Sequence, residues 1–326
     1  KTGFKWLKAL ARHGMGGILA DDMGLGKTLQ VLAYLMSVRQ EGRPSLVVTP
    51  TSLVYNWQEE AAKFTPALRT LVVTGQQGER QAALTELEAV DLVITSYGLL
   101  KRDIELYEQL EWKTCFLDEA QNIKNPQTLN AQAVKRIRAG CCFALTGTPI
   151  ENSLTELWSI FDYVMPGYLR HHASFVKRFE APVAKDPNSP VLRELSRHIR
   201  PFLLRRMKHT VLQELPEKIE SRLSAPMTAE QTRLYTAWLM SARQEFEQEI
   251  ETKGFDQSRI KILAILTRLR QLCCHPALFV ENYSGGSGKM ELIADVVRDA
   301  VAAGHRLLIF SQFTGMLDLI KPVLDE

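Results

Sequence analysis

The sequence predicts an α/β protein in which helices flank a parallel β-sheet. Short apolar runs alternate with segments of helical periodicity over the first 167 residues, as in β-α-β units with right-handed crossovers. Polar clusters follow several of these runs directly. Because parallel sheets bind ligands beyond the carboxyl ends of their strands, we expect a ligand site at that edge.

The first apolar run leads into the segment Ile-Leu-Ala-Asp-Asp-Met-Gly-Leu-Gly-Lys-Thr at residues 18–28. It predicts a strand, a glycine-bearing turn and a helix, an arrangement that directs backbone N–H groups at phosphate oxygens. Gly24 and Gly26 permit close approach of the backbone. Lys27 is expected to bind the β- and γ-phosphates, and the Thr28 hydroxyl to help hold Mg²⁺. The segment therefore predicts a nucleoside triphosphate site.

The match to the phosphate-loop pattern is incomplete, because Asp21 stands where the pattern has glycine. An ordinary loop-to-helix junction is the alternative interpretation. Apolar residues at helical spacing favour the nucleotide site. These residues are Leu25, Leu29, Leu32 and Met36.

Five further apolar runs suit buried parallel strands. Pro50 stops the first of them, and a helix is expected from Ser52 to Phe64. The runs lie at residues 46–49, 71–73, 92–94, 115–117 and 142–145.

Asp118 and Glu119 directly follow the run at 115–117. An acidic residue at the end of a buried strand can position Mg²⁺, and its neighbour can orient or deprotonate an attacking water. A solvated acidic turn is the alternative. Together with a phosphate loop upstream, the pair predicts an ATPase.

Helix signals continue beyond the predicted sheet. Asn125-Pro126 is expected to open a helix, and the basic residues Lys135, Arg136 and Arg138 at its far end are interpreted as structural. Ser153 and Glu156 predict a capping box for another helix.

From about residue 168 the alternation stops, and residues 168–275 are expected to be mainly helical, with Pro182, Pro187 and Pro190 marking a loop. The basic stretch Arg197–His209 either contacts DNA phosphates or tethers this helical region to the sheet.

Thr228 with Gln231 caps a long helix. The composition of residues 284–288 predicts a linker. The apolar run within Arg306–Phe310 predicts a strand of a second α/β domain. The predicted domains are therefore residues 1–167, 168–283 and 289–326, with the linker at 284–288.

Composition is that of an ordinary globular protein of 326 residues, with 40 basic and 37 acidic residues and a formal charge of +3. No apolar run approaches the length of a membrane span, so we expect no membrane partner. Five cysteines without Cys-x-x-Cys spacing predict reduced, buried thiols and a reducing compartment. The Cys-Cys-His run at 273–275 has residue types that can bind a metal ion, but packing in the core is the favoured interpretation.

In combination these motifs resemble those of the Swi/Snf-type ATPases of helicase superfamily two, which move along double-stranded DNA. The motifs follow the family's order over nearly the whole chain. They are Asp-Asp-Met-Gly-Leu-Gly-Lys-Thr (21–28), Thr-Pro to Trp (49–57), Thr-Ser-Tyr (95–97), Asp-Glu-Ala-Gln (118–121), Leu-Thr-Gly-Thr-Pro-Ile (145–150), Pro-Phe-Leu-Leu-Arg-Arg (201–206), Leu-Pro-Glu-Lys (215–218), Leu-Arg-Gln-Leu-Cys-Cys-His-Pro (269–276) and Ile-Phe-Ser-Gln-Phe (309–313).

The resemblance implies a first RecA-like lobe, a helical protrusion and the start of a second RecA-like lobe. It implies that Lys27, Asp118 and Glu119 act in ATP hydrolysis and that Thr28 and Asp118 hold Mg²⁺. Residues implied to lie along DNA are Thr49, Pro50, Thr95, Ser96 and Tyr97. Thr146 and Thr148 are implied to couple ATP state to the grip on nucleic acid.

Departures from the family pattern bear on activity. Asp22 stands where the family usually has Glu. The family's adenine-recognising Gln would fall just before Lys1, and the motifs with the arginine fingers would fall beyond Glu326. Loss of an arginine finger lowers phosphoryl transfer by ~10³–10⁵. We therefore expect the 326-residue chain alone to bind nucleotide weakly and to turn it over poorly.

Two other function classes stay open at this point. An RNA helicase would be stimulated more by RNA than by duplex DNA, and a non-enzymatic, nucleotide-gated module would not need Glu119. Within the leading class, the expected partners are double-stranded DNA and a bound complex such as RNA polymerase or a nucleosome. Compact spacing and the lack of obvious histone-tail-reading segments favour a bacterial protein. We also expect a monomer in the cytoplasm, associated with the nucleoid if the protein is bacterial.

Overall fold

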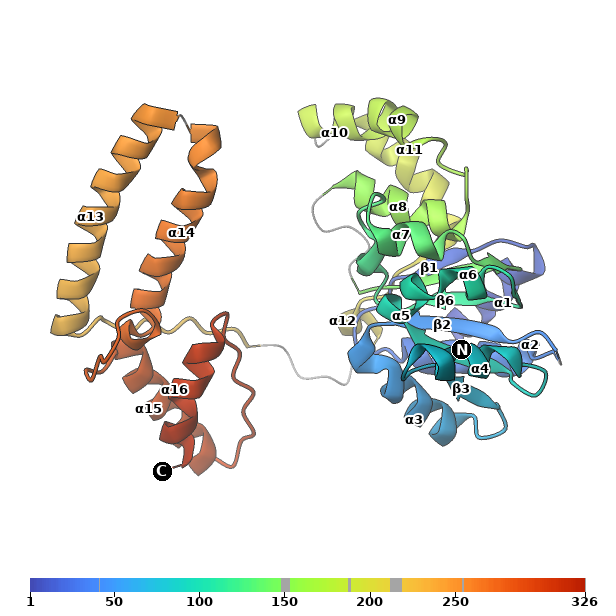
Figure 1. Cartoon of the computed structure of the whole chain (residues 1–326), viewed down its shortest axis with the longest axis horizontal. Helices are drawn as coiled ribbons and strands as arrows, with labels where there is room; N and C mark the ends of the chain where they lie inside the picture. The colour runs from blue at the N-terminus through green and yellow to red at the C-terminus, as the bar shows by residue number, and fades with distance from the viewer. Residues whose placement is uncertain (41, 148–152, 187–188, 212–218, 254, 326) are drawn as a thin grey trace. The chain divides into compact units, whose positions relative to one another are not determined.

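The computed structural model describes residues 1–40, 42–147, 153–186, 189–211, 219–253 and 255–325. The chain forms two compact units, Lys1–Pro216 and Glu217–Glu326 (Figure 1). The expected domain boundaries at 167, 283 and 288 stay predictions, because a division by packing does not report where functional domains begin.

The first unit is built on a seven-stranded sheet in the order β3-β4-β2-β6-β8-β1-β9. All neighbouring strands are parallel, so their carboxyl ends lie at one edge. The predicted α/β class is confirmed, and six of the strands were predicted. Their bounds are Gly17–Leu19 (β1), Ser45–Thr49 (β2), Thr70–Val72 (β3), Leu92–Ser96 (β4), Cys115–Leu117 (β6), Cys142–Leu145 (β8) and Leu203–Leu204 (β9).

Helices cover both faces of this sheet (Figure 1). Consecutive strand residues point to opposite faces, and Ile18 and Leu19 of β1 accordingly belong to different buried clusters. Helices α1–α3 supply the cluster of Leu19, and α5, α7 and α8 supply the cluster of Ile18. The helices are α1 (Thr2–Arg12), α2 (Lys27–Val38), α3 (Val54–Phe64), α4 (Gln77–Thr85), α5 (Tyr97–Arg102), α6 (Ile104–Tyr107), α7 (Leu129–Val134) and α8 (Leu154–Val164).

A helical region follows α8, as predicted, and it packs on the first unit. Phe175, Phe179 and Leu195 from this region join the cluster of Ile18. Pro182 and Pro190 lie in the first turns of helices, and do not mark a loop; Pro187 lies outside the described residues. The region comprises α9 (His172–Phe175), the π-helix η3 (Val176–Glu180), α10 (Ala181–Lys185), α11 (Pro190–Ile199), the 3₁₀ helix η4 (Arg200–Phe202), strand β9 and α12 (Lys208–Val211).

The second unit contains two long helices, α13 (Ala229–Lys253) and α14 (Phe255–Cys274), and two shorter ones, α15 (Gly288–Ala302) and α16 (Thr314–Asp325). The predicted capping box of α13 is confirmed. Gln231 N donates to Thr228 Oγ1 at 3.2 Å, and Thr228 N donates to Gln231 Oε1 at 3.3 Å.

The predicted strand Arg306–Phe310 is wrong for this structure, which gives these residues no regular secondary structure. Leu308 and Phe310 are 85% and 87% exposed. A strand needs a neighbour to satisfy its backbone hydrogen bonds, and the described part of the second unit holds no other strand.

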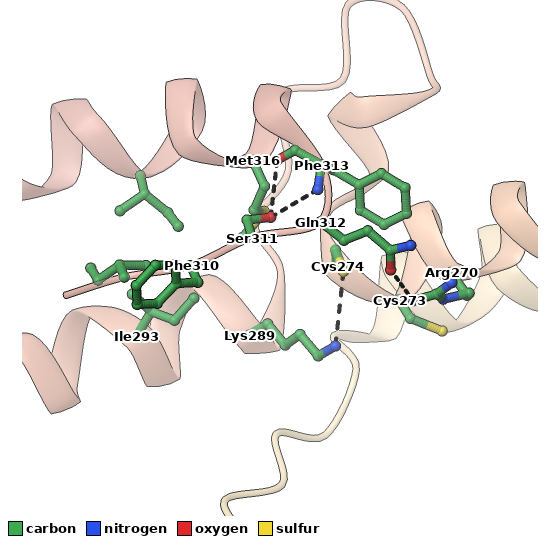
Figure 2. A pocket seen from close by; sticks show the side chains of 12 residues that line it. Arg270, Cys273, Cys274, Lys289, Ile293, Phe310, Ser311, Gln312, Phe313 and Met316 are labelled. Atoms are coloured by element: carbon green, nitrogen blue, oxygen red, sulfur yellow. Dashed lines mark hydrogen bonds between the residues drawn. The ribbon is translucent and has the colours of Figure 1, made fainter. Parts of the chain in front are cut away.

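A pocket lies between the end of α14, the start of α15 and the segment before α16 (Figure 2). Lys289 Nζ lies 3.9 Å from Cys274 Sγ there. Burial raises the pKa of the Cys273 thiol, which disfavours the reactive thiolate form. The pocket contains none of the predicted site residues.

All five cysteines are free thiols, and Cys115 and Cys141 are buried.

One predicted helix start needs correction. Asn125-Pro126 forms a turn, in which Asn125 Oδ1 accepts from Gln127 N at 3.0 Å. Helix α7 begins only at Leu129, where Thr128 Oγ1 caps Ala131 N at 3.3 Å. The Asn side chain is used by the preceding turn, so the later cap starts the helix.

Ser153 does occupy the N-cap position of α8, but the predicted capping box is wrong: within the described residues the Ser153 hydroxyl makes no capping hydrogen bond. Glu156 Oε1 lies 3.8 Å from Lys124 Nζ instead.

The interpretation of the basic residues after α7 as structural is supported by two ion pairs. Lys135 Nζ lies 2.6 Å from Asp162 Oδ2, and Arg136 Nη2 lies 2.7 Å from Glu108 Oε1. None of the described helices combines the length and the apolar composition needed to cross a bilayer.

Candidate nucleotide-binding site

The predicted phosphate loop joins β1 to α2 at the carboxyl edge of the sheet. Gly24 and Gly26 have φ of +87° and +68°, a left-handed conformation that favours glycine. Helix α2 opens at Lys27 with Gly26 as its N-cap. Lys27 Nζ donates to Asp21 O at 2.7 Å and to Asp22 O at 3.5 Å. The loop's own carbonyls therefore hold the ammonium beside its helix N-terminus.

Asp21, the departure from the phosphate-loop pattern, has a structural partner. Its side chain is fully buried, and its Oδ1 accepts from Arg206 N at 3.1 Å and from Arg206 Nε at 2.9 Å. Arg206 Nη2 also donates to Asp21 Oδ2 and, at 2.6 Å, to Gln30 Oε1. Arg206 thus tethers the segment after the helical region to the loop, one of the two roles foreseen for the basic stretch.

The other basic residues of that stretch have exposed side chains. They are Arg197, Arg200, Arg205 and Lys208. Contact of these residues with DNA stays a prediction.

Asp118 follows β6 at the same edge and is 8% exposed. Its Oδ2 accepts from Trp57 Nε1 at 2.8 Å and from Thr49 Oγ1 at 3.2 Å, and its Oδ1 accepts from Glu119 N at 3.0 Å. The Tyr97 hydroxyl donates to Asp118 O at 2.7 Å. Burial raises the pKa of Asp118, and the Trp57 hydrogen bond opposes this. The carboxylate is thus fixed in orientation by uncharged donors.

Glu119 has a left-handed backbone with φ +49°, uncommon for a residue other than glycine and frequent at functional sites. Its Oε2 accepts from Gln121 Nε2 at 2.7 Å, and Gln121 Oε1 accepts from Thr146 Oγ1 at 3.1 Å. A chain of side-chain hydrogen bonds therefore connects the predicted water-activating group to the predicted coupling residue Thr146. The second coupling residue, Thr148, lies outside the described residues.

Glu60 of α3 belongs to the site but was missed by the sequence analysis. Its pKa is raised by burial and by the charge of Asp118, while a hydrogen bond with the Thr28 hydroxyl lowers it. Glu60 therefore lies near both predicted Mg²⁺-binding residues. The spacing Trp57-x-x-Glu60 was the available signal, because residues three apart share one helix face.

These residues fit a nucleotide with Mg²⁺. The loop offers two left-handed glycines, a lysine and a helix N-terminus for phosphate. Thr28, Asp118 and Glu60 offer oxygen atoms, the ligands that Mg²⁺ prefers. The charge of an ionised Asp118, surrounded by uncharged donors, remains available to a cation.

The side chains predicted to contact DNA are mostly buried. Thr49, Thr95, Ser96 and Tyr97 are at most 4% exposed, and Pro50 is half-buried. Thr49 and Tyr97 support Asp118, as described above. Because a buried hydroxyl does not reach a phosphate, DNA contact here would use the main chain or another conformation, and it stays a prediction.

The family model described as the SNF2-related domain matches residues 1–278. The putative ATP-dependent helicase/translocase YwqA of Bacillus subtilis is 40% identical over 339 aligned positions, which cover all of this chain and 36% of that protein. The TATA-binding protein-associated factor MOT1 of Saccharomyces cerevisiae is 35% identical, over 98% of this chain and 19% of that protein.

A solved structure of the Sulfolobus solfataricus SWI2/SNF2 ATPase core in complex with double-stranded DNA is also similar. The TM-score is 0.63 at 37% identity, over 99% of this chain and 68% of that chain. The chain thus spans about a third or less of the length of these two curated relatives, and residues 1–278 of it match the family model. By its fold, its motifs and these similarities, the chain belongs to the SNF2-related family.

Proposed function

We propose that the protein containing this chain is an ATPase that uses hydrolysis to move along double-stranded DNA and to displace or remodel proteins bound there. The observation that carries the proposal is that the phosphate loop follows β1 and Asp118 with Glu119 follows β6, two parallel strands that both pair with β8 and end at the same edge of the sheet. This juxtaposition brings a phosphate loop and an acidic pair, from different strands, to one place.

Each side chain has a distinct task in this proposal. Lys27 neutralises the outer phosphates, and the N–H groups of the loop orient them. Thr28 and Asp118 would hold Mg²⁺, which supplies charge neutralisation to the transferring phosphoryl group. Glu119, oriented by Gln121, positions the attacking water and accepts its proton.

Support for DNA as partner comes from the relatives and from surface charge. The archaeal core similar to this chain was solved with double-stranded DNA. In this structure α5 follows β4 at the carboxyl edge and ends with exposed Lys101 and Arg102, which suit phosphate contacts without base recognition. A DNA-bound target such as an RNA polymerase complex, a monomeric state and a cytoplasmic, nucleoid-associated location complete the proposal.

Steady-state ATP turnover tests the proposal, with duplex DNA, with RNA and without nucleic acid. We expect the intact protein to be strongly stimulated by duplex DNA, and the 326-residue chain to be poorly active. Glu119→Gln should lower turnover by at least ~10² in the intact protein, because a positioned general base contributes typically 10²–10⁴-fold. Glu88→Gln, at an exposed position outside the site, is the matched control.

Greater stimulation by RNA than by duplex DNA would assign the protein to the RNA helicases. DNA-dependent remodelling that survives Glu119→Gln would identify a non-enzymatic, nucleotide-gated module.

A further inference from the structure

The segment that follows the helical region runs alongside the phosphate loop. Leu203 and Leu204 of β9 pair with Ile18 and Leu19 of β1. The alignment continues past the strands, because Ala20 N donates to Leu204 O at 2.7 Å. Residues 203–206 are therefore aligned with residues 18–22 by main-chain hydrogen bonds.

The same alignment reaches Asp22 and Lys208. Asp22 N donates to Arg206 O at 3.0 Å, and Lys208 N donates to Asp22 Oδ2 at 2.8 Å. Main-chain and side-chain groups of Asp22 thus both fix the path of this segment. Together with the Asp21–Arg206 ion pair, they place Lys208 beside Gly24 of the loop.

The Lys208 side chain extends over Gly24. A Cβ added to Gly24 would lie 3.6 Å from Lys208 Nζ and 3.8 Å from its Cε. The side chain is exposed, so an anion arriving from solvent can reach the ammonium. Lys27 Nζ, held by the carbonyls of Asp21 and Asp22, is a second ammonium at the same loop.

We infer that Lys208 is a second phosphate-binding cation of the nucleotide site, held over Gly24 by residues 203–208. The inference rests on the proposed function, because it assumes that the loop binds a nucleoside triphosphate. A triphosphate carries several negative charges, and charge-assisted hydrogen bonds from two ammonium groups bind it more tightly than one. Arg206 acts as a positioning residue, since it neutralises Asp21 and fixes the main chain next to Lys208.

One consequence concerns communication along the chain. Lys208 lies in α12, shortly before the second compact unit begins at Glu217. A phosphate bound by Lys208 would therefore hold the last part of the first unit before the chain continues into the second. ATP and its hydrolysis products would differ in this contact.

Residue-specific labelling tests the inference in the 326-residue chain. Lysines are acylated briefly with and without MgATP, and the modification of each is quantified by mass spectrometry. We expect MgATP and inorganic triphosphate to protect Lys208 several-fold, adenosine to give no protection, and exposed Lys177 to react equally in all samples. Protection by duplex DNA but not by MgATP would identify Lys208 as a DNA contact and overturn the inference.

Titration with a fluorescent ATP analogue up to millimolar concentration provides the second arm. Lys208→Ala should weaken binding about tenfold or more, as expected for loss of one charged hydrogen bond, and Lys208→Arg should restore most of it. Lys177→Ala should change nothing. The unfolding midpoint of each variant is measured to show that the fold is kept.

Lys27→Ala separates the inference from the proposed function. If Lys27→Ala weakens binding and Lys208→Ala does not, the nucleotide site stands and the role of Lys208 is overturned. If neither variant changes binding, the loop does not bind the nucleotide, and both proposals fail.

Discussion

Two buried carboxylates at the carboxyl edge of the sheet have opposite surroundings. Asp21 follows β1, is fully buried and is paired with the Arg206 guanidinium. Asp118 follows β6, is 8% exposed and is held by uncharged donors from Trp57, Thr49 and the main chain. Both acidic residues follow a strand of the sheet. Within the described residues, however, only the charge of Asp21 is balanced by a cationic side chain.

The difference separates an acid with a structural partner from the acid that we propose to hold Mg²⁺. A carboxylate already neutralised by arginine has little affinity left for a metal ion, whereas one fixed by neutral donors keeps its charge for a cation. The residue type and its place after a strand are therefore insufficient to assign a role. The role depends on which groups surround the carboxylate. Three substitutions test this difference between Asp21 and Asp118.

The largest expected effect belongs to Arg206→Ala. It leaves Asp21 buried without its cation, which costs about 3–5 kcal/mol of the free energy of unfolding. Urea unfolding measures the loss, and Arg205→Ala, at the exposed neighbouring position, should stay within ~0.5 kcal/mol. Adding Asp21→Asn should recover part of the stability. A loss below ~1 kcal/mol would contradict the structural role of Asp21.

Asp118→Asn should have the opposite effect on stability to that of Arg206→Ala. It is expected to raise the free energy of unfolding at pH 7, on the order of 1 kcal/mol, because a buried charge without a counter-ion is removed. ATP turnover should be lost at the same time. Loss of stability together with activity would place Asp118 in the structural class of Asp21.

The pH dependence of the free energy of unfolding provides a second test of Asp118→Asn. Burial raises the pKa of Asp118 above its ordinary value of 3.8. Its stabilising contribution is therefore fully present below that value and is lost as pH rises through the raised folded pKa. The Asp118→Asn variant should not show this loss of stability with rising pH. Asp91 is the control of opposite sign, because Arg69 lowers its pKa, and its contribution is lost as pH falls.

Thr49→Val should give the smallest effect. It removes one hydroxyl donor at constant shape, at about 0.5–1.5 kcal/mol. Since the Thr49 hydrogen bond lowers the pKa of Asp118, the variant should move the acid limb of ATP turnover to higher pH. An unchanged limb would show that Thr49 does not tune Asp118. Weaker binding of duplex DNA would identify Thr49 as the DNA contact that the motif implies.

Much of the sheet was predictable because its strands are buried on both faces. Apolar runs such as Leu46–Thr49 and Leu92–Ile94 carry that signal directly, and the polar residues after them mark the binding edge. The phosphate loop and the Asp118–Glu119 pair are local patterns, so a sequence reading could identify both.

The unpredicted features depend on partners distant in sequence. Strand β9 has two residues, too short for periodicity, and it exists because β1 offers a free edge. Arg206 finds Asp21 across 185 positions, so no local pattern reveals the pair. The predicted strand at Arg306–Phe310 had the right composition, but the described part of the second unit gives it no neighbour.

The pairing of Asp21 with Arg206 also has a consequence for biosynthesis. Residues 18–28 leave the ribosome before their partner strand and their arginine, which follow about 185 residues later. Contacts of such long separation form late in folding, because a long chain must be closed first. During translation the phosphate loop thus carries an unpaired acid until residue 206 emerges. Its affinity for nucleotide should therefore mature only when the helical region before β9 has been made.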